Sequence, residues 1–305
     1  MTRIVSLIPS ATEIVHALGL GDCQLGRSHE CDYPASVRSL PVCTAPKFEP
    51  SGNSREISRS VQATLHQALS VYDVFREVLE QLQPSHIITQ SQCEVCAVSL
   101  KDVEAAVGEL ISSDIQLVSL EAHSWAHVLR DIVCVAKALG VESKGQDLVI
   151  RLEQRMSTIS DRACSARERP RVACLEWLEP LMAAGNWMPE LVTMAGGQNL
   201  LGEAGEHSGS ITWESLLESD PEVLVLMPCG FDMKRTREEM YWLTDRVEWN
   251  TLTAVKNGRV YVTDGNQYFN RPGPRLVESL EILAEIAHPD LFAPRFKETG
   301  WQQVL

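Results

Sequence analysis

Residues 3–13, Arg-Ile-Val-Ser-Leu-Ile-Pro-Ser-Ala-Thr-Glu, decide the fold, because they describe a short buried strand that leads directly into a helix. The strand runs from Ile4 to Ile8, and the apolar residues that follow recur at helical spacing. Ser10 and Glu13 have the spacing of a capping box, which predicts Ser10 as the N-cap of the helix. A buried strand followed by a helix is the first unit of an α/β protein.

The same alternation of strand and helix continues through the first part of the chain. The patterns predict strands at 24–28, 86–89 and 115–119, and helices at 55–70, 73–82 and 98–111. Residues 29–54 are rich in Pro, Ser and Cys and are expected to form a loop. Strands that alternate with helices predict a parallel sheet that is covered on both faces.

The middle of the chain has a different pattern, with helical spacing and no convincing strand from about residue 123 to 166. We expect one long helix there, or two helices that join near Gly140. At about 1.5 Å per residue, such a helix is long enough to connect two lobes.

A strand similar to the first one then returns at residues 171–175, Arg-Val-Ala-Cys-Leu. Further strands are predicted at 222–227 and 259–263, and helices at 187–195, 234–243 and 273–287. The sequence therefore predicts an α/β fold of two Rossmann-like lobes, with parallel sheets joined by a long connecting helix. The predicted domains are an N-terminal lobe at 1–121, the connecting helix at 122–168 and a C-terminal lobe at 169–305.

Composition excludes several classes of protein. The chain has 305 residues, with 27 Lys and Arg against 41 Asp and Glu, and its net charge of −14 argues against a nucleic-acid partner. No apolar run approaches the roughly 18 residues of a transmembrane segment. The apolar stretch that ends at Pro9 is too short for a secretory signal, so the sequence predicts a cytoplasmic protein.

Candidate ligand contacts lie in the loops that follow the predicted strands, because ligands bind at the carboxyl ends of parallel strands. In the first half these loops hold His29, Cys31, Cys93 and Cys96. In the second half, polar and aromatic residues gather in or near the corresponding loops, namely Glu176, Trp177, Trp187, Trp213, Phe231, Tyr268, Asn270 and Arg271. We therefore expect the ligand to be bound by aromatic and polar side chains.

The sequence resembles the periplasmic cobalamin- and siderophore-binding proteins of ABC importers. The resemblance rests on residues 3–13, Asp32-Tyr33-Pro34, Gln83-Pro84, 195–200 (Ala-Gly-Gly-Gln-Asn-Leu) and 271–275 (Arg-Pro-Gly-Pro-Arg), which occur in family order. It implies the class III substrate-binding protein fold and a small-molecule ligand in the cleft between the lobes. It also implies an ABC permease as a partner and a function without catalysis. That family is normally exported, which differs from the predicted location.

For the ligand, the resemblance implies cobalamin, another corrinoid or a related metal complex. The positions that match the family's aromatic cleft residues are Trp177, Trp213 and Tyr268, which would form flat apolar walls. Asn270 and Arg271 lie near them and would bind amide or phosphate groups of the ligand. Glu176, Trp187 and Phe231 complete the predicted ligand-binding set through their places in or near the same loops.

A metal site is the alternative prediction. Cys93 and Cys96 have the spacing of a pair that chelates zinc or iron, and Cys31 and His29 would complete a tetrahedral set. No sequence rule brings these four residues within bonding distance, and thiols also pack as small apolar groups. In this alternative the chain is a cytosolic metal- or thiol-dependent enzyme on the same scaffold.

Overall fold

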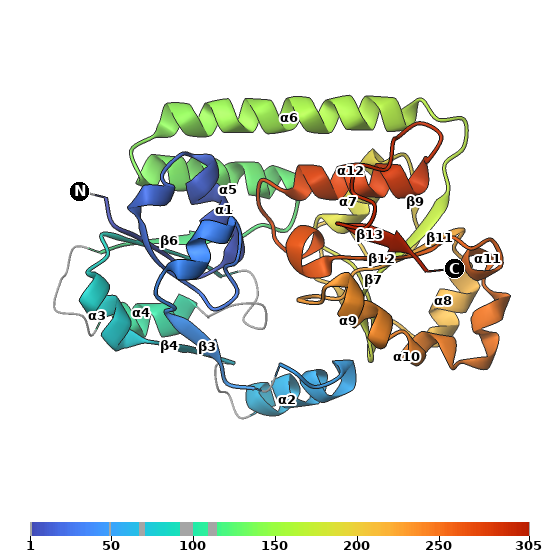
Figure 1. Cartoon of the computed structure of the whole chain (residues 1–305), viewed down its shortest axis with the longest axis horizontal. Helices are drawn as coiled ribbons and strands as arrows, with labels where there is room; N and C mark the ends of the chain where they lie inside the picture. The colour runs from blue at the N-terminus through green and yellow to red at the C-terminus, as the bar shows by residue number, and fades with distance from the viewer. Residues whose placement is uncertain (1, 49, 67–70, 92–99, 109–114, 305) are drawn as a thin grey trace. The chain divides into compact units, whose positions relative to one another are not determined.

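The computed structural model describes residues 2–48, 50–66, 71–91, 100–108 and 115–304 (Figure 1). The chain forms two compact units. Unit 1 consists of Met1–Gly52, Glu56–Ala122 and Ala126–Arg151, and unit 2 consists of Asn53–Arg55, His123–Trp125 and Leu152–Leu305. The short segments at 53–55 and 123–125 thus belong to unit 2, although their sequence neighbours belong to unit 1. The predicted domain limits at 121 and 168 stay a prediction.

Unit 1 is built on a four-stranded sheet, here called sheet 1, in the order β2-β1-β5-β6. Its strands are β1 (Ile4–Ser6), β2 (Gln24–Arg27), β5 (His86–Gln90) and β6 (Gln116–Leu120). All neighbouring strands are parallel, which confirms the parallel sheet predicted for this half. A separate antiparallel pair, β3 (Thr44–Pro46) and β4 (Tyr72–Val74), lies where a loop and a helix start were predicted, because three-residue strands show no periodicity.

The helices that lie wholly in unit 1 include three that were predicted and two short ones that were not, and the start of the first helix needs a correction. They are α1 (Pro9–Ala17), α3 (Arg76–Leu82), α4 (Leu100–Gly108) and the short η1 (Gly21–Cys23) and η2 (Ala35–Ser39). Helix α1 begins at Pro9, its N-cap is Ile8, and no side chain caps it, so the predicted cap at Ser10 is wrong. Proline is favoured at the first helical position because its fixed φ suits a helix start.

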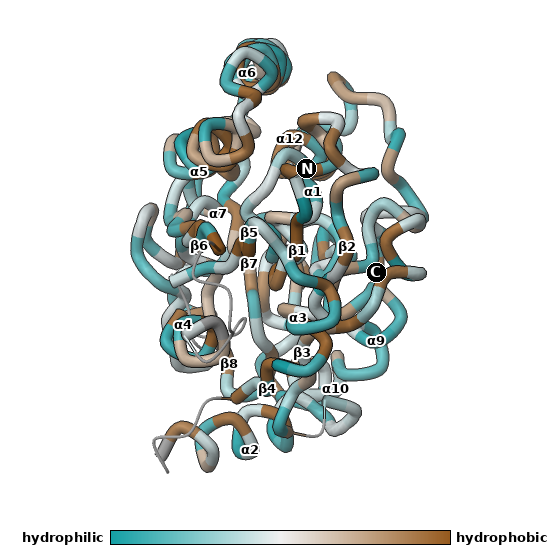
Figure 2. Tube along the Cα trace, turned by 90° about the vertical axis from the view of Figure 1, so that its left-hand side faces the viewer, coloured by the Kyte–Doolittle hydropathy of each residue, from teal (hydrophilic) through white to brown (hydrophobic). Residues whose placement is uncertain are grey.

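Three further helices cross between the units along the chain. Helix α2 (Ser54–His66) starts at the 53–55 segment, α5 (Trp125–Ala138) starts at the 123–125 segment, and α6 (Glu142–Cys164) passes the boundary at Arg151. The two-helix alternative is correct, since α5 and α6 are separated near Gly140, whose φ of +69° favours glycine. Along α6 the buried residues Leu148, Leu152, Met156 and Ile159 recur every three or four positions, as expected of a helix with one buried face. Figure 2 views this helix nearly along its axis and shows both hydrophilic and hydrophobic residues around it.

Unit 2 is built on a seven-stranded sheet, here called sheet 2. Its order is β10-β8-β7-β11-β12-β13, with β9 beside β7. The central strands β7 (Arg171–Leu178), β11 (Val223–Leu226) and β12 (Val260–Thr263) are parallel, as is β9 (Gln198–Asn199). Three further strands run antiparallel to the strand with which they pair: β8 (Leu181–Ala183) to β7, β10 (Gly209–Ser210) to β8, and β13 (Trp301–Gln303) to β12. Sheet 2 is therefore mixed where a parallel sheet was predicted.

The remaining elements of unit 2 are helical. They are α7 (Met188–Met194), α8 (Trp213–Ser219), α9 (Met233–Glu238), α10 (Tyr241–Thr244), η3 (Val247–Thr251), α11 (Thr253–Lys256), the π-helical η4 (Gly265–Phe269) and α12 (Leu276–Ala287). The helix predicted at 234–243 is divided into α9 and α10. Fully buried residues of the central strands, including Leu175, Leu224 and Val260, form the core beneath these helices. This core fixes the ends of the central strands, where the candidate site lies.

Candidate functional site

The carboxyl ends of the three central strands of sheet 2 meet at one edge. In the register of the sheet, Val225 of β11 lies opposite Cys174 of β7 and Tyr261 of β12. The loops that follow these strands therefore leave the sheet at the same level. In α/β proteins this edge is where ligands bind. The structure thus brings Trp177, Phe231 and Arg271 of the predicted ligand-binding set to one edge of unit 2. Phe231 and Arg271 lie in loops, whereas Trp177 lies in β7 itself, because that strand continues to Leu178 and not to the predicted limit at residue 175.

Hydrogen bonds hold these loops to one another. The Cys229 backbone N–H donates to the Glu176 carbonyl at 3.1 Å, which joins the loop after β11 to β7. The Asn266 N–H donates to the Phe231 carbonyl at 3.1 Å, which joins the loop after β12 to the loop after β11. The Asn270 side chain adds a second tie, since its Nδ2 donates to the Met227 carbonyl at 3.1 Å. Asn270 therefore fixes the loop conformation.

Two aromatic rings pack together at this edge. The ring centroids of Trp177 and Phe231 are 5.1 Å apart at 53°, within the usual range of aromatic pairs. Phe231 is buried, whereas Trp177 is partly exposed. The Arg235 guanidinium lies 4.0 Å from the centre of the Phe231 ring. The Trp177 indole N–H is also held, because it donates to the carbonyls of Ser54 and Glu179 at 3.2 and 3.1 Å.

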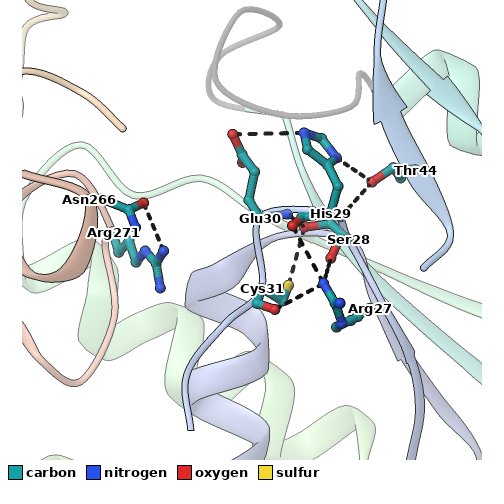
Figure 3. Close-up of polar contacts among 8 residues, drawn as sticks. All are labelled: Arg27, Ser28, His29, Glu30, Cys31, Thr44, Asn266 and Arg271. Atoms are coloured by element: carbon teal, nitrogen blue, oxygen red, sulfur yellow. Dashed lines mark hydrogen bonds and ion pairs between the residues drawn. The ribbon is translucent and has the colours of Figure 1, made fainter. Parts of the chain in front are cut away.

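A buried arginine lies in the same set of loops. Arg271 is only 5% exposed, and its Nη2 donates to the Asn266 Oδ1 at 2.9 Å (Figure 3). Asn266 therefore links Arg271 to the backbone of Phe231. A guanidinium fixed in this way presents charged donors that suit a carboxylate, phosphate or amide oxygen. Asn266 was not among the predicted site residues, although it lies in the loop that holds Arg271.

Other polar groups of unit 2 surround the end of β7. The Ser208 Oγ donates to the Glu176 Oε2 at 2.7 Å and accepts from the Gly185 N–H at 2.9 Å. The His123 Nδ1 lies 3.3 Å from the Oδ1 of Asn186, which has a φ of +51°. Sequence reasoning missed Ser208 and Asn186, because the partners of these contacts are far apart in the sequence and no motif joins them.

The remaining aromatic residues of the predicted set have local partners. Trp187 is buried and its indole N–H donates to the Phe269 carbonyl at 3.0 Å. Trp213 belongs to the core cluster, and its indole N–H donates to the Glu248 Oε2 at 3.3 Å. Tyr268 packs edge-on against Phe296, with ring centroids 5.7 Å apart. These contacts hold the three side chains in place within unit 2, and their predicted role in ligand binding stays a prediction.

In unit 1, His29 follows β2 at the carboxyl edge of sheet 1. Its Nδ1 lies 2.8 Å from the Thr44 Oγ1 (Figure 3). Its ring centroid lies 5.4 Å from that of Tyr72. Burial, and to a smaller extent the charge of Arg27, lower the pKa of His29 to about 4. The imidazole is therefore neutral near pH 7.

Cys31 lies two residues further along and is fully buried. Its Sγ lies 3.1 Å from the Thr12 Oγ1 and 3.2 Å from the Ser28 Oγ. Burial raises the pKa of the Cys31 thiol, so the thiolate that a metal ligand requires is disfavoured. Cys93 and Cys96 lie outside the described residues. Among the residues that the structure does describe, no group of three or more His, Cys, Asp or Glu side chains could hold a metal ion.

Comparison with known proteins decides the family. A family model described as periplasmic binding protein matches residues 4–267, which is most of the chain. The chain belongs to the periplasmic binding protein family. This membership confirms the predicted family resemblance, and the similarity to solved structures confirms the predicted fold class.

The similar proteins are named as binding proteins. An uncharacterised ABC transporter substrate-binding lipoprotein of Bacillus subtilis is 26% identical over 95% of this chain and 81% of its own length. A vitamin B12-binding protein of Vibrio cholerae is 24% identical over 92% of this chain and 86% of its own length. A solved periplasmic haem-binding protein of Pseudomonas aeruginosa has a TM-score of 0.72 at 20% identity, and covers 95% of this chain and 94% of its own.

The relatives also correct the predicted location. They are periplasmic or lipoprotein substrate-binding proteins, so the cytoplasmic assignment for this periplasmic binding protein is wrong. The assignment rested only on the short apolar stretch at the start of the sequence, and family membership is the stronger observation. The relatives give no support to the alternative of a cytosolic enzyme. Among the described helices, none is long and apolar enough to cross a membrane.

Proposed function

We propose that the chain is the substrate-binding component of an ABC importer, and that the carboxyl edge of sheet 2 binds a corrinoid or a related metal complex. The observation that carries the proposal is that an aromatic pair, the partly exposed Trp177 and the buried Phe231, lies beside a buried arginine, Arg271. Asn266 connects the two, since it accepts from Arg271 and donates to the Phe231 carbonyl. The names of the relatives, which include binding proteins for vitamin B12 and haem, support this class of ligand. The partner is the membrane permease of the importer.

The chemistry of the edge suits a large, flat ligand with polar groups at its rim. The indole of Trp177 offers an apolar surface against which a macrocycle can pack. The Arg271 guanidinium can donate to amide or phosphate oxygens of the ligand. Because the loops are already tied by the hydrogen bonds of Asn266 and Asn270, little ordering is left to occur on binding. Binding is reversible and involves no chemical step.

The first experiment is an absorption spectrum with elemental analysis of the protein purified from its native host. A corrinoid spectrum with cobalt, or a haem spectrum with iron, is expected at near one ligand per chain. Protein that is colourless as isolated is titrated with cyanocobalamin and with haemin, and binding is followed by tryptophan fluorescence. Failure to bind either probe would contradict the proposed ligand class.

A pair of variants then tests the location of the site. Trp177→Leu removes the partly exposed indole, and we expect the affinity for the bound probe to fall by about tenfold, equivalent to about 1.4 kcal/mol. Trp249→Phe is the matched control, since Trp249 is a buried core residue of the same unit. Equal losses in the two variants would show that stability, and not the proposed edge, determines binding.

A further inference from the structure

We infer that Glu239 is a positioning residue for Trp177, and that it acts through Ser54. The inference rests on the proposed function, because it concerns the aromatic surface of the candidate site. Glu239, Ser54 and Trp177 are far apart in the sequence, yet all three belong to unit 2. A chain of hydrogen bonds connects them, and its first member is a buried carboxylate.

The first link is between Glu239 and Ser54. Glu239 follows helix α9 and is only 6% exposed, and Ser54, the first residue of α2, is fully buried. The Glu239 Oε2 accepts from the Ser54 N–H at 2.8 Å and also from the Ser54 hydroxyl. Burial of a carboxylate is costly unless hydrogen bonds compensate for it. Both donors come from one residue, so this carboxylate fixes the position of Ser54 in particular.

The second link is between Ser54 and the indole of Trp177. The Ser54 carbonyl accepts from the Trp177 Nε1 at 3.2 Å, and the Glu179 carbonyl accepts from the same N–H at 3.1 Å. An ion pair also joins the residue after Ser54 to Glu179, because the Arg55 Nη2 lies 3.1 Å from the Glu179 Oε1. The two carbonyls that hold the indole therefore belong to segments that are also joined through their side chains.

The orientation of Trp177 depends on both links. Phe231 packs against the indole ring, and the Ser54 and Glu179 carbonyls hold its N–H edge. Without the Glu239 carboxylate, the Ser54 N–H and hydroxyl lose their acceptor inside the protein. The 53–55 segment then relaxes and its carbonyl leaves the indole, so Trp177 gains freedom that must be lost again on binding. Glu239 thus lowers the cost of binding.

The test compares Glu239→Ala with Glu239→Gln, in the full chain, by titration with cyanocobalamin and, if wild type does not bind it, with haemin. The glutamine carbonyl can still accept from Ser54, so it should rescue much of the loss. We expect Glu239→Ala to weaken binding by about tenfold, equivalent to about 1.4 kcal/mol, and Glu239→Gln by clearly less. Ser54→Ala, which removes only the hydroxyl, provides a milder variant if Glu239→Ala does not fold.

A second readout reports the positioning itself. The indole N–H of Trp177, assigned by its loss in Trp177→Phe, is followed by nitrogen-15 NMR for its rate of hydrogen exchange. Faster exchange in Glu239→Ala, restored in Glu239→Gln, supports the inference even if wild type binds neither probe, in which case only the proposed ligand class fails. Unchanged exchange in Glu239→Ala overturns the inference, whatever happens to affinity. Unchanged affinity in a variant with faster exchange overturns the claim that positioning aids binding.

Discussion

The two units differ in how they use aromatic residues. All seven tryptophans of the chain belong to unit 2. They are Trp125, Trp177, Trp187, Trp213, Trp242, Trp249 and Trp301. In unit 2 the indole N–H groups of Trp177, Trp187 and Trp301 each donate to a carbonyl or a carboxylate. Indoles combine a large apolar surface with one donor, so they serve both as core and as loop anchors.

Both units bury charged as well as neutral polar groups, and they differ in how many charged groups are held by hydrogen bonds near the core. In unit 1 a neutral network connects Ser6, Thr12, Gln24, Ser28 and Cys31, with Glu13 and Asp131 as buried acidic residues elsewhere. Unit 2 buries Glu239, Glu285 and Arg271, each with hydrogen-bond partners. A lost partner is more costly for a buried charge than for a neutral group. Single substitutions at buried charged residues of unit 2 should therefore lower stability more than substitutions in the neutral network of unit 1.

The largest effect is expected for Glu285→Ala in unit 2. The Glu285 carboxylate is 4% exposed and accepts from the Arg295 N–H at 2.9 Å and from the Trp301 indole at 2.7 Å. Its removal leaves these donors without an acceptor, so the free energy of unfolding should fall by about 3 kcal/mol. Urea denaturation followed by tryptophan fluorescence measures this, because the signal comes from unit 2. A loss below about 1 kcal/mol would show that this buried carboxylate matters no more than a neutral hydrogen-bonding group.

A smaller loss is expected for Thr12→Val in unit 1. The Thr12 hydroxyl is fully buried and contacts the Ser6 hydroxyl, the Cys31 thiol at 3.1 Å and the Gln24 Nε2 at 3.3 Å. Valine keeps the shape and removes the hydroxyl, so the free energy of unfolding should fall by about 1–2 kcal/mol. Circular dichroism during denaturation reports it. Thr12→Ser is the control that retains the hydroxyl, and it should be the more stable of the two variants.

His29 should make the stability of unit 1 depend on pH. Its pKa is lowered from 6.5 to about 4, so the unfolded chain binds a proton that the folded chain does not bind between these values. The contribution of the neutral imidazole is therefore fully present above pH 6.5 and is lost progressively as the pH falls toward 4. Thermal unfolding of wild type and His29→Gln at both ends of this window measures it. If the melting temperature of both proteins fell by the same amount across this window, His29 would not contribute to the pH dependence of stability.

The smallest effects are expected for exposed ion pairs, which occur in both units. In unit 1 the Arg76 Nε lies 2.8 Å from the Glu80 Oε1 on α3. In unit 2 the Lys234 Nζ lies 3.9 Å from the Glu238 Oε1 on α9. Glu80→Gln and Glu238→Gln should each change the free energy of unfolding by less than about 0.5 kcal/mol, and salt should remove the difference. A larger change in either unit would indicate a role for that pair beyond helix stabilisation.

Periodicity predicted the fold well where elements are long or central. The strands β1, β5, β7, β11 and β12 lie within one to three residues of their predicted limits, because buried parallel strands are continuous apolar runs. The strands β3, β4, β8, β9, β10 and β13 were missed. Each has only two or three residues, too few to show a periodic pattern. All except β8, which pairs with the adjacent β7, also depend on pairing with a distant segment, which local sequence does not encode.

The candidate site was predictable to a similar extent. Strand-end position located Trp177, Phe231 and Arg271, because the carboxyl edge of a parallel sheet follows from topology. The partners of these residues were not predictable in the same way. The contact of Ser54 with Trp177 joins positions 123 residues apart, and that of Ser208 with Glu176 joins positions 32 residues apart. Only the folded chain brings such pairs together.

The edges of sheet 2 have a consequence for how separate molecules behave. The sheet ends in β10, with two residues, and in β13, with three, and both strands are antiparallel to their neighbours. An exposed edge strand is a template for pairing with another chain, and a very short edge presents few unpaired N–H and C=O groups. The short edges of sheet 2 therefore offer little backbone for strand addition by a second molecule.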